Sequence, residues 1–215
     1  MNPPTRTVVH LVRHGEVYNP EGVLYGRLPG FHLSDRGHEM ARLVAAHLGD
    51  HDITHVVASS LQRAQQTAAP VAEEHGIPVT TDDRVIEASN RFEGQHVASM
   101  SPRDFIHPRH WAMLTNPLRP SWGEAYVEVA ARMVAAIDDA RAAARGHEAV
   151  VVSHQLPIWT ARNALMGKRL WHDPRKRECR LASLTTLTYL GDDLTSVTYA
   201  EPAASLLSST SGGTG

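Results

Sequence analysis

The sequence predicts an α/β fold: a three-layer α/β/α sandwich with a mostly parallel central sheet. Short runs of β-branched residues alternate with longer amphipathic stretches, the order typical of parallel strands joined by helices. The most apolar run, 149–153, shows no polar alternation, as expected for a strand buried on both faces of its sheet. The chain contains no repeat and no linker. Residues 1–204 are therefore expected to form one domain, and the Ser/Gly/Thr-rich residues 205–215 a disordered tail.

The N-terminal half is expected to hold two strand–helix pairs. Residues 7–12 form a β-branched run, and the helix over 34–49 has a serine at its N-cap and a glycine where it stops. A second strand at 55–58 leads into a helix over 59–76, which two serines can cap and whose apolar positions recur at helical spacing. Residues 77–79 are expected to form an edge strand, because the proline among them cannot donate to a ladder.

The C-terminal half begins with an irregular stretch. Residues 82–123 are polar and rich in proline and histidine, and no periodic pattern runs through them. A long Ala-rich helix is expected over 124–145, followed by the strand 149–153 and a helix that starts at Pro157 and ends at Gly167. Two further strands, within 183–199, are joined by a Gly-Asp-Asp turn and are expected to form a hairpin.

Composition excludes several classes of protein. With 21 Lys and Arg against 23 Asp and Glu, the formal net charge is −2, which argues against a nucleic-acid binder. The single cysteine, Cys179, excludes an intramolecular disulfide and cysteine-rich zinc sites, and we expect it to be inert. No apolar run approaches the roughly 20 residues of a membrane span, and no signal peptide is visible. A cytoplasmic protein without a membrane partner is therefore expected.

Polar side chains follow three of the predicted parallel strands. Arg13 and His14 end the first strand, Arg63 lies in the first turn of the helix after the second, and His154 and Gln155 follow the most apolar one. Because ligands of open α/β sheets bind at the carboxyl ends of strands, these side chains are expected to converge. Guanidinium groups match phosphoryl oxygens, helix N-termini add N–H donors, and a neutral imidazole can attack phosphorus. The sequence thus predicts an anion pocket that contains a nucleophile and no carboxylate cluster for a metal.

These strand ends belong to longer motifs that occur in a fixed order over about residues 7–158. The motifs are 11–16 with Asn19 a little further on, 59–68 and 151–154, with further matches at 26–27, 33–37 and 123–124. They resemble the motifs of the histidine phosphatase superfamily, also called the phosphoglycerate mutase-like family.

The resemblance implies a phosphomonoester phosphatase that works through a phosphohistidine on His14. Arg13, Arg63 and His154 would hold the phosphoryl oxygens and supply the positive charge that magnesium supplies elsewhere, so neither a metal nor a cofactor is implied. The partner would be a small phosphorylated metabolite, and the oligomeric state stays open. The residues implied to bind the phosphate group are Arg13, Asn19, Arg63, His154 and Gln155.

The leaving oxygen needs a proton, and the resemblance suggests which group provides it. One branch of the family places the acid directly after the second catalytic histidine, where this chain has Gln155, which cannot serve as an acid. The other branch uses a glutamate after the second motif, which Glu87 fits, followed by Glu93 in a trailing motif. We therefore expect Glu87 to be the acid, with Glu93 as the alternative. Two departures from the family pattern are Gln155, where glycine is common, and residues 88–91.

Other functions stay open beside a phosphatase. The stretch from Glu87 to His154 is shorter than the insert that mutases of the superfamily carry, which favours a phosphatase over a cofactor-dependent phosphoglycerate mutase. A phospholigand-binding module without turnover would keep the same pocket. A metal-dependent hydrolase would use some of the 14 histidines of the chain.

Two groups of side chains outside these motifs are expected to be solvated. His51 and His55 are four residues apart, but their stretch is typical of a loop entering a strand, so metal binding is not expected of them. The second group is a basic cluster, for which attraction of an anionic substrate is the alternative. Its members are Lys168, Arg169, Arg175, Lys176, Arg177 and Arg180.

Overall fold

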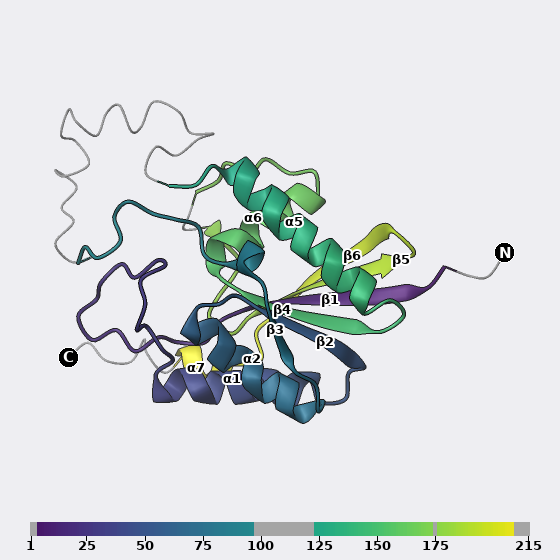
Figure 1. Cartoon of the computed structure of the whole chain (residues 1–215), viewed down its shortest axis with the longest axis horizontal. Coiled ribbons are helices and arrows are strands. Elements are labelled where there is room, and N and C mark those ends of the chain that lie inside the picture. The colour runs from purple at the N-terminus through teal and green to yellow at the C-terminus, as the bar shows by residue number, and fades with distance from the viewer. Residues whose placement is uncertain (1–3, 97–122, 174–175, 209–215) are drawn as a thin grey trace.

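The structure is a computed structural model that describes residues 4–96, 123–173 and 176–208. Six strands form one sheet in the order β3-β2-β4-β1-β5-β6 (Figure 1). Strands β1 to β4 pair in parallel, and β5 and β6 extend the sheet as an antiparallel hairpin beside β1. The mostly parallel sheet predicted from the sequence is therefore confirmed. The strands are β1 (Arg6–Arg13), β2 (Ile53–Ala58), β3 (Val79–Thr81), β4 (Glu148–Ser153), β5 (Leu184–Leu190) and β6 (Asp193–Ala200).

Helices cover both faces of the sheet, which confirms the three layers. In Figure 1, α5 and α6 lie above the sheet, and α1, α2 and α7 lie below it. Within the described ranges, none of the helices is both long and apolar enough to cross a membrane. The helices are α1 (Asp35–Leu48), α2 (Gln62–Glu74), the 3-10 turn η1 (Asp83–Val85), α5 (Tyr126–Ala143), α6 (Gln155–Leu165) and α7 (Ala204–Ser208).

The central strands bury side chains on both faces, and each face has its own apolar cluster. In β1, Val9 and Leu11 pack in the cluster under α5, whereas Val12 packs in the cluster under α1 and α2. Residues of β4 alternate in the same way, with Val151 on the α5 side and Val152 on the other. Each such fully buried side chain contributes about 1.5–3 kcal/mol to folding. The inner strands therefore hold the loops at their carboxyl ends on a rigid base.

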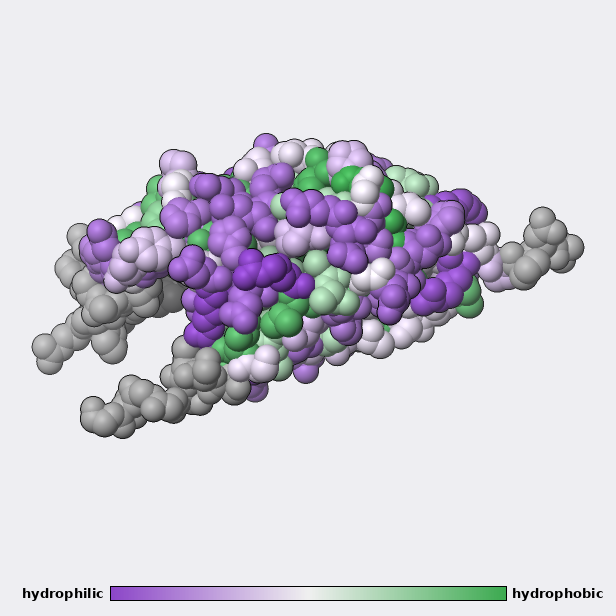
Figure 2. Space-filling model, turned by 90° about the horizontal axis from the view of Figure 1, so that it is seen from below, coloured by the Kyte–Doolittle hydropathy of each residue, from purple (hydrophilic) through white to green (hydrophobic). Residues whose placement is uncertain are grey.

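The outer faces of α1 and α2 are polar, as amphipathic helices require. Figure 2 views the molecule from this side, and hydrophilic residues cover most of it, with hydrophobic residues in smaller groups. On α1, Arg42 and His47 are exposed, whereas Met40 and Val44 are buried against the sheet. The 3.6-residue period predicted from the sequence is thus the period of burial.

Some predicted boundaries were wrong. Helix α2 begins at Gln62, and its N-cap residue is Leu61, which has no capping side chain. The Ser59 hydroxyl accepts from the Leu61 N–H and lies 2.8 Å from His154 Nε2. Helix α6 begins at Gln155, two residues before Pro157, since a proline within the first turn has no intrahelical N–H bond to lose.

Two further corrections concern the ends of shorter elements. Strand β3 spans Val79–Thr81 rather than 77–79 and so excludes Pro78, which has no N–H to donate. The tail predicted to be disordered from Ser205 begins with α7, because Leu206 and Leu207 pack against the core under α1 and α2. Residues 209–215 of that tail lie outside the described part of the chain.

Two glycines let the segment after β1 pack against the first turn of α1. A Cβ on Gly15 would lie 2.6 Å from the carbonyl oxygen of Gly37, and a Cβ on Gly37 would collide with the carbonyl oxygen of Glu16. Ser34 caps the same turn, its hydroxyl accepting from the Gly37 N–H and donating to the Glu16 carboxylate. The position of the residue after His14 is therefore set by this backbone contact and by the Gly15 N–H, which donates to the Thr67 hydroxyl at 3.1 Å.

Gly37→Ala is expected to lower the free energy of unfolding by about 1–3 kcal/mol, the usual effect of forcing atoms into a packed contact. Gly49→Ala is the matched control, because Gly49 has an ordinary helical φ of −58° and its Cβ would meet nothing closer than 3.5 Å. Urea unfolding of both variants measures the difference. Equal stability of the two variants would contradict the close approach.

Candidate active site

A cavity of about 500 Å³ lies at the carboxyl ends of β1 and β4, where the sequence places its motifs. Arg63 and His154 lie beside it, buried next to His14. The three predicted strand ends therefore converge. The sequence-predicted residues that line the cavity itself are Arg13, His14, Asn19, Glu87 and Gln155.

His14 directly follows β1 and is 2% exposed. Its backbone N–H donates to the carbonyl of Ser153, which ties it to the end of β4. Its Nδ1 lies 2.8 Å from the carbonyl oxygen of Gly15, and because a carbonyl only accepts, the ring proton is on Nδ1 and the lone pair on Nε2. Burial, and then the charges of Arg13 and Arg63, hold the pKa of His14 well below its usual value. The imidazole is thus a neutral base with a defined tautomer.

His154 follows β4 in the same way and is fully buried. Its ring centroid lies 5.0 Å from that of His14, and its Nε2 is 2.8 Å from the Ser59 hydroxyl. Burial, followed by the neighbouring His14 and Arg63, lowers the pKa of His154 well below its usual value. Its Nδ1 is buried and has no hydrogen-bond partner among the described residues. Both imidazoles are therefore neutral, and a bound anion would favour protonation of His154.

Two guanidinium groups lie close to His14, that of Arg63 buried and that of Arg13 half-buried. Arg13 donates from Nη1 to the carbonyl of Cys179 at 2.8 Å, and Arg63 donates from Nη2 to the carbonyl of Gly26 at 2.6 Å. The carbon of the Arg63 guanidinium also lies 4.8 Å from the centre of the Tyr25 ring, and this side chain is 1% exposed. The Nε atoms of both arginines are buried without a hydrogen-bond partner in the described structure. Buried donors of this kind are expected to have an acceptor, and beside a neutral histidine that acceptor is an anion.

Glu87 lies two residues after η1, and its carboxyl group lines the cavity. One of its oxygens, Oε1, accepts from the N–H of Ala88 at 2.9 Å. Burial raises the pKa of Glu87, although Arg63 and Arg13 act in the opposite direction. The alternative acid, Glu93, accepts from the N–H of Asn90 and is not among the residues that line the cavity. Geometry therefore favours Glu87 as the proton donor.

An ion-pair network fixes the segment that carries Glu87. Arg132 of α5 donates from Nη1 to the carbonyls of Arg84 and Ile86 and binds Glu124 through its other nitrogens. Arg27 binds the same carboxylate and donates from Nε to the Glu87 carbonyl at 2.6 Å. The motif residues Arg27 and Glu124, to which the sequence analysis gave no role, thus position the candidate acid.

Asn19 and Gln155 line the cavity but are partly engaged elsewhere. Both the carbonyl and the amide of the Asn19 side chain bond to the backbone of Val23, which closes a short loop. Gln155 donates to the Cys179 carbonyl at 3.3 Å and accepts from Arg177 at 3.4 Å. Each amide still has a second N–H, so a phosphate contact by either residue stays a prediction.

Arg177 and Tyr25 line the cavity and were missed by the sequence analysis. The expectation of a solvated basic cluster holds for Lys168, Arg169, Lys176 and Arg180, which are exposed, and Arg175 lies outside the described residues. It is wrong for Arg177, which turns inward: its Nε donates to His172 Nε2 at 2.7 Å, and burial lowers the pKa of Arg177. The alternative that the sequence left open, attraction of an anionic substrate, fits this side chain.

Cys179 contributes only its backbone to the site. The thiol is buried, and burial raises its pKa to about 11, in line with the inert cysteine expected from the sequence. Its carbonyl oxygen, however, accepts from both Arg13 and Gln155.

The fold and this arrangement of residues define a class of enzyme. Residues 9–202 match the model of the histidine phosphatase superfamily, branch 1, and the chain belongs to that superfamily. The family predicted from the motifs is confirmed. With phosphatases among its solved structural neighbours, the chain is a phosphatase enzyme.

Particular relatives are similar over nearly the whole chain. The uncharacterized protein Rv0525 of Mycobacterium tuberculosis H37Rv is 58% identical over 203 residues, 94% of this chain and 99% of the relative. The probable phosphoglycerate mutase GpmB of Yersinia pestis is 31% identical over 183 residues, 84% of each chain. The solved mycobacterial glucosyl-3-phosphoglycerate phosphatase Rv2419c superimposes with a TM-score of 0.71 at 26% identity, covering 91% of this chain and 96% of that one.

Proposed function

We propose that this protein is a metal-independent phosphomonoester phosphatase that acts through a phosphohistidine on His14. One observation carries the proposal: a buried, neutral imidazole whose Nε2 has the lone pair lies close to two guanidinium groups whose buried Nε atoms have no hydrogen-bond partner among the described residues. A neutral imidazole is a nucleophile toward phosphorus, and the arginines balance the charge that develops on the phosphoryl oxygens.

The reaction has two steps. In the first, Nε2 of His14 attacks phosphorus, the bond to the ester oxygen breaks, and Glu87 gives its proton to the leaving oxygen. In the second, the Glu87 carboxylate takes a proton from a water molecule as that water attacks phosphorus and the P–N bond breaks. Arg13 and Arg63 hold the phosphoryl group throughout, and His154 binds it as an imidazolium when the anion is present.

The substrate is proposed to be a small phosphorylated metabolite. The cavity of about 500 Å³ is larger than a phosphate group needs, and its lining includes Leu24, Tyr25 and Tyr126, which suit an organic leaving group. Asn19 and Gln155 are proposed to add N–H donors to the phosphate. The mycobacterial neighbour is named as a phosphatase of glucosyl-3-phosphoglycerate, which makes phosphorylated sugar acids the first compounds to assay.

The first test is phosphate release from p-nitrophenyl phosphate in excess chelator. In the second, the enzyme is denatured rapidly without acid during turnover of a phosphate ester with a labelled phosphoryl group, which traps any phosphoenzyme. We expect turnover that is indifferent to chelator and a labelled intermediate that is stable in base and labile in acid, as an N-linked phosphate is. Loss of turnover in chelator would overturn the proposal in favour of a metal-dependent hydrolase.

Two other outcomes correspond to the other functions that the pocket allows. Interconversion of phosphoglycerate isomers that depends on a bisphosphoglycerate primer, without net phosphate release, would indicate a mutase, as the name of the 31% identical relative suggests. Saturable vanadate binding without release from any ester would indicate a binding module. Either result would contradict the proposal.

Arg177, which lines the cavity, is expected to strengthen substrate binding. Arg177→Met should raise KM for phosphate esters about 10-fold with little change in kcat, the usual cost of losing one hydrogen bond to a charged group. Arg180→Met is the control, because Arg180 is exposed and pairs with Glu201 outside the cavity. Steady-state kinetics of both variants provide the measurement, and an unchanged KM in Arg177→Met would remove this residue from the site.

A further inference from the structure

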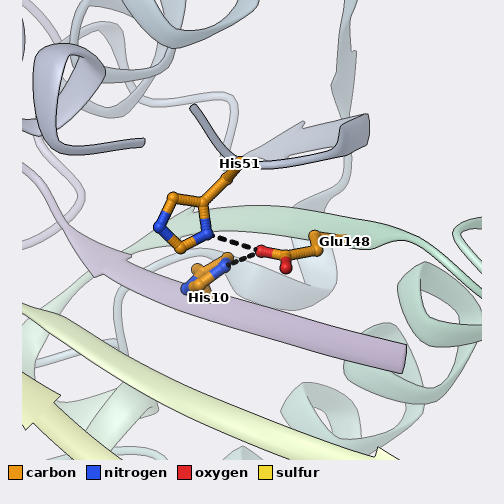
Figure 3. A group of neighbouring side chains, drawn as sticks. All are labelled: His10, His51 and Glu148. Carbon is orange, nitrogen blue, oxygen red and sulfur yellow. Dashed lines mark hydrogen bonds and ion pairs between the residues drawn. The ribbon is translucent and has the colours of Figure 1, made fainter. Parts of the chain in front are cut away.

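Three side chains with metal-binding atoms meet away from the cavity of His14. His10 of β1, His51 of the loop between α1 and β2, and Glu148 at the start of β4 each place one donor atom within 4.8 Å of the other two (Figure 3). Glu148 lies at the opposite end of β4 from His154, about 20 Å away at roughly 3.3 Å per residue. The sequence analysis expected His51 to be solvated; its side chain is 37% exposed, but its ring turns toward Glu148.

The two imidazoles point at the same carboxylate oxygen. The distance to Glu148 Oε2 is 2.7 Å from His10 Nε2 and 2.8 Å from His51 Nδ1. A carboxylate oxygen accepts, so each of these nitrogens donates a proton in the metal-free state. The same hydrogen bonds lower the pKa of Glu148 to about 2, which keeps the carboxylate charged. Two ring nitrogens and one carboxylate oxygen therefore lie close together, and in the metal-free state only the two N–H protons lie between them.

The surroundings hold these donors in place. Nδ1 of His10 lies 2.9 Å from the Thr186 hydroxyl, which can accept the Nδ1 proton when Nε2 binds a metal. The Glu148 N–H donates to the carbonyl of Asp52, which joins the His51 loop to the start of β4. His10 is buried, whereas the His51 side chain is 37% exposed, so solvent reaches the cluster at His51. The Arg6 guanidinium lies 3.6 Å from the other Glu148 oxygen and would repel a bound metal ion, but the Arg6 side chain is 60% exposed, so solvent weakens this repulsion.

We propose that His10 Nε2, His51 Nδ1 and Glu148 Oε2 form a site for one divalent transition-metal ion of the zinc type. Two imidazoles and one carboxylate are a ligand set that suits zinc, whereas magnesium and calcium prefer oxygen ligands alone. When the metal binds, the ring proton that now points at Glu148 moves to the other nitrogen of the same imidazole, so each histidine binds as a neutral ligand. The ion joins β1, β4 and the loop before β2, so its role is to stabilise the sheet at the end remote from His14.

Cobalt(II) and zinc titrations of the untagged full chain test this site. One equivalent of cobalt should produce a visible ligand-field band that zinc removes. Saturating zinc should raise Tm by about 5 °C or more, and magnesium should not. His51→Gln and Glu148→Gln should each weaken cobalt binding at least about 10-fold, and Thr186→Val roughly 10- to 100-fold.

His147→Gln is the matched control. His147 is also paired with a carboxylate, Asp52, and is adjacent to Glu148 in sequence, but it lies outside the cluster, so its loss should leave cobalt affinity unchanged. Absence of the band and of the zinc-dependent shift in Tm would overturn the proposal. So would equal affinity in the wild type and in the variants His51→Gln and Glu148→Gln, since exposed histidines would then account for binding. Turnover in chelator is unaffected either way, so this proposal and the phosphatase mechanism can fail separately.

Discussion

His14→Ala is expected to reduce kcat for p-nitrophenyl phosphate by at least about 10⁴-fold, because removing a covalent nucleophile removes the two-step pathway itself. The labelled phosphoenzyme should disappear in the same variant. Steady-state phosphate release and the trapping of label measure the two effects independently. Turnover that survives at even a hundredth of the wild-type rate would contradict nucleophilic attack by this imidazole.

A loss caused by misfolding must be distinguished from a loss of the nucleophile, because His14 is buried at the carboxyl ends of β1 and β4. The variant retains Arg13, Arg63 and His154, so it should still bind vanadate while releasing no phosphate. His147→Ala serves as the control histidine, since it is exposed and belongs to the opposite end of the sheet. It should keep wild-type turnover.

Glu87→Gln is expected to separate substrates by their leaving groups. An alkyl phosphate expels a strongly basic oxygen and should lose about 10²- to 10⁴-fold in kcat, the usual contribution of general acid catalysis. p-Nitrophenyl phosphate expels a stable phenolate and should lose far less. Glu93→Gln is the matched control and should affect both substrates equally and weakly. If Glu93→Gln instead shows the selective loss for alkyl phosphates, Glu93 rather than Glu87 is the general acid.

The pH profile provides a second readout of Glu87. Burial raises the pKa of Glu87 above its usual value, so the protonated acid persists to higher pH, and kcat/KM should fall as pH rises through that raised pKa. His14 must be neutral to attack, and its pKa is held well below its usual value, so activity should fall on the acid side only as pH drops through that lowered pKa. Glu87→Gln should abolish the alkaline limb and keep the acid one. An unchanged alkaline limb would contradict the assignment.

Much of the fold and the centre of the site could be predicted because both are encoded locally. The composition of a run such as 149–153, apolar throughout, indicates a strand buried on both faces. A polar or charged residue directly after such a strand lies at its carboxyl end, where ligands of open α/β sheets bind. His14 and His154 were found in this way, and the structure brings their rings within 5.0 Å of each other. Glu87 depended on the family resemblance, since an isolated glutamate in an irregular stretch has no local signal.

The remaining features depend on contacts between distant segments. Arg177 sits among exposed basic residues, and nothing in that run distinguishes the one side chain that turns inward. His10, His51 and Glu148 come from three separate elements, and no spacing between them in the chain has the period of a helix or a strand. A buried histidine in the middle of an apolar strand was the one available hint.

The residues that hold Glu87 also bring two distant parts of the chain together. Asn90 pairs with Gly123, the Glu124 N–H donates to the Ser89 carbonyl, and a Cβ on Gly123 would lie 2.7 Å from that same carbonyl oxygen. The chain thus comes back beside the segment of the candidate acid at residue 123, where backbone atoms make the contact. Because this contact leaves no room for a Cβ at residue 123, the position of Glu87 depends on a glycine that takes no part in the chemistry.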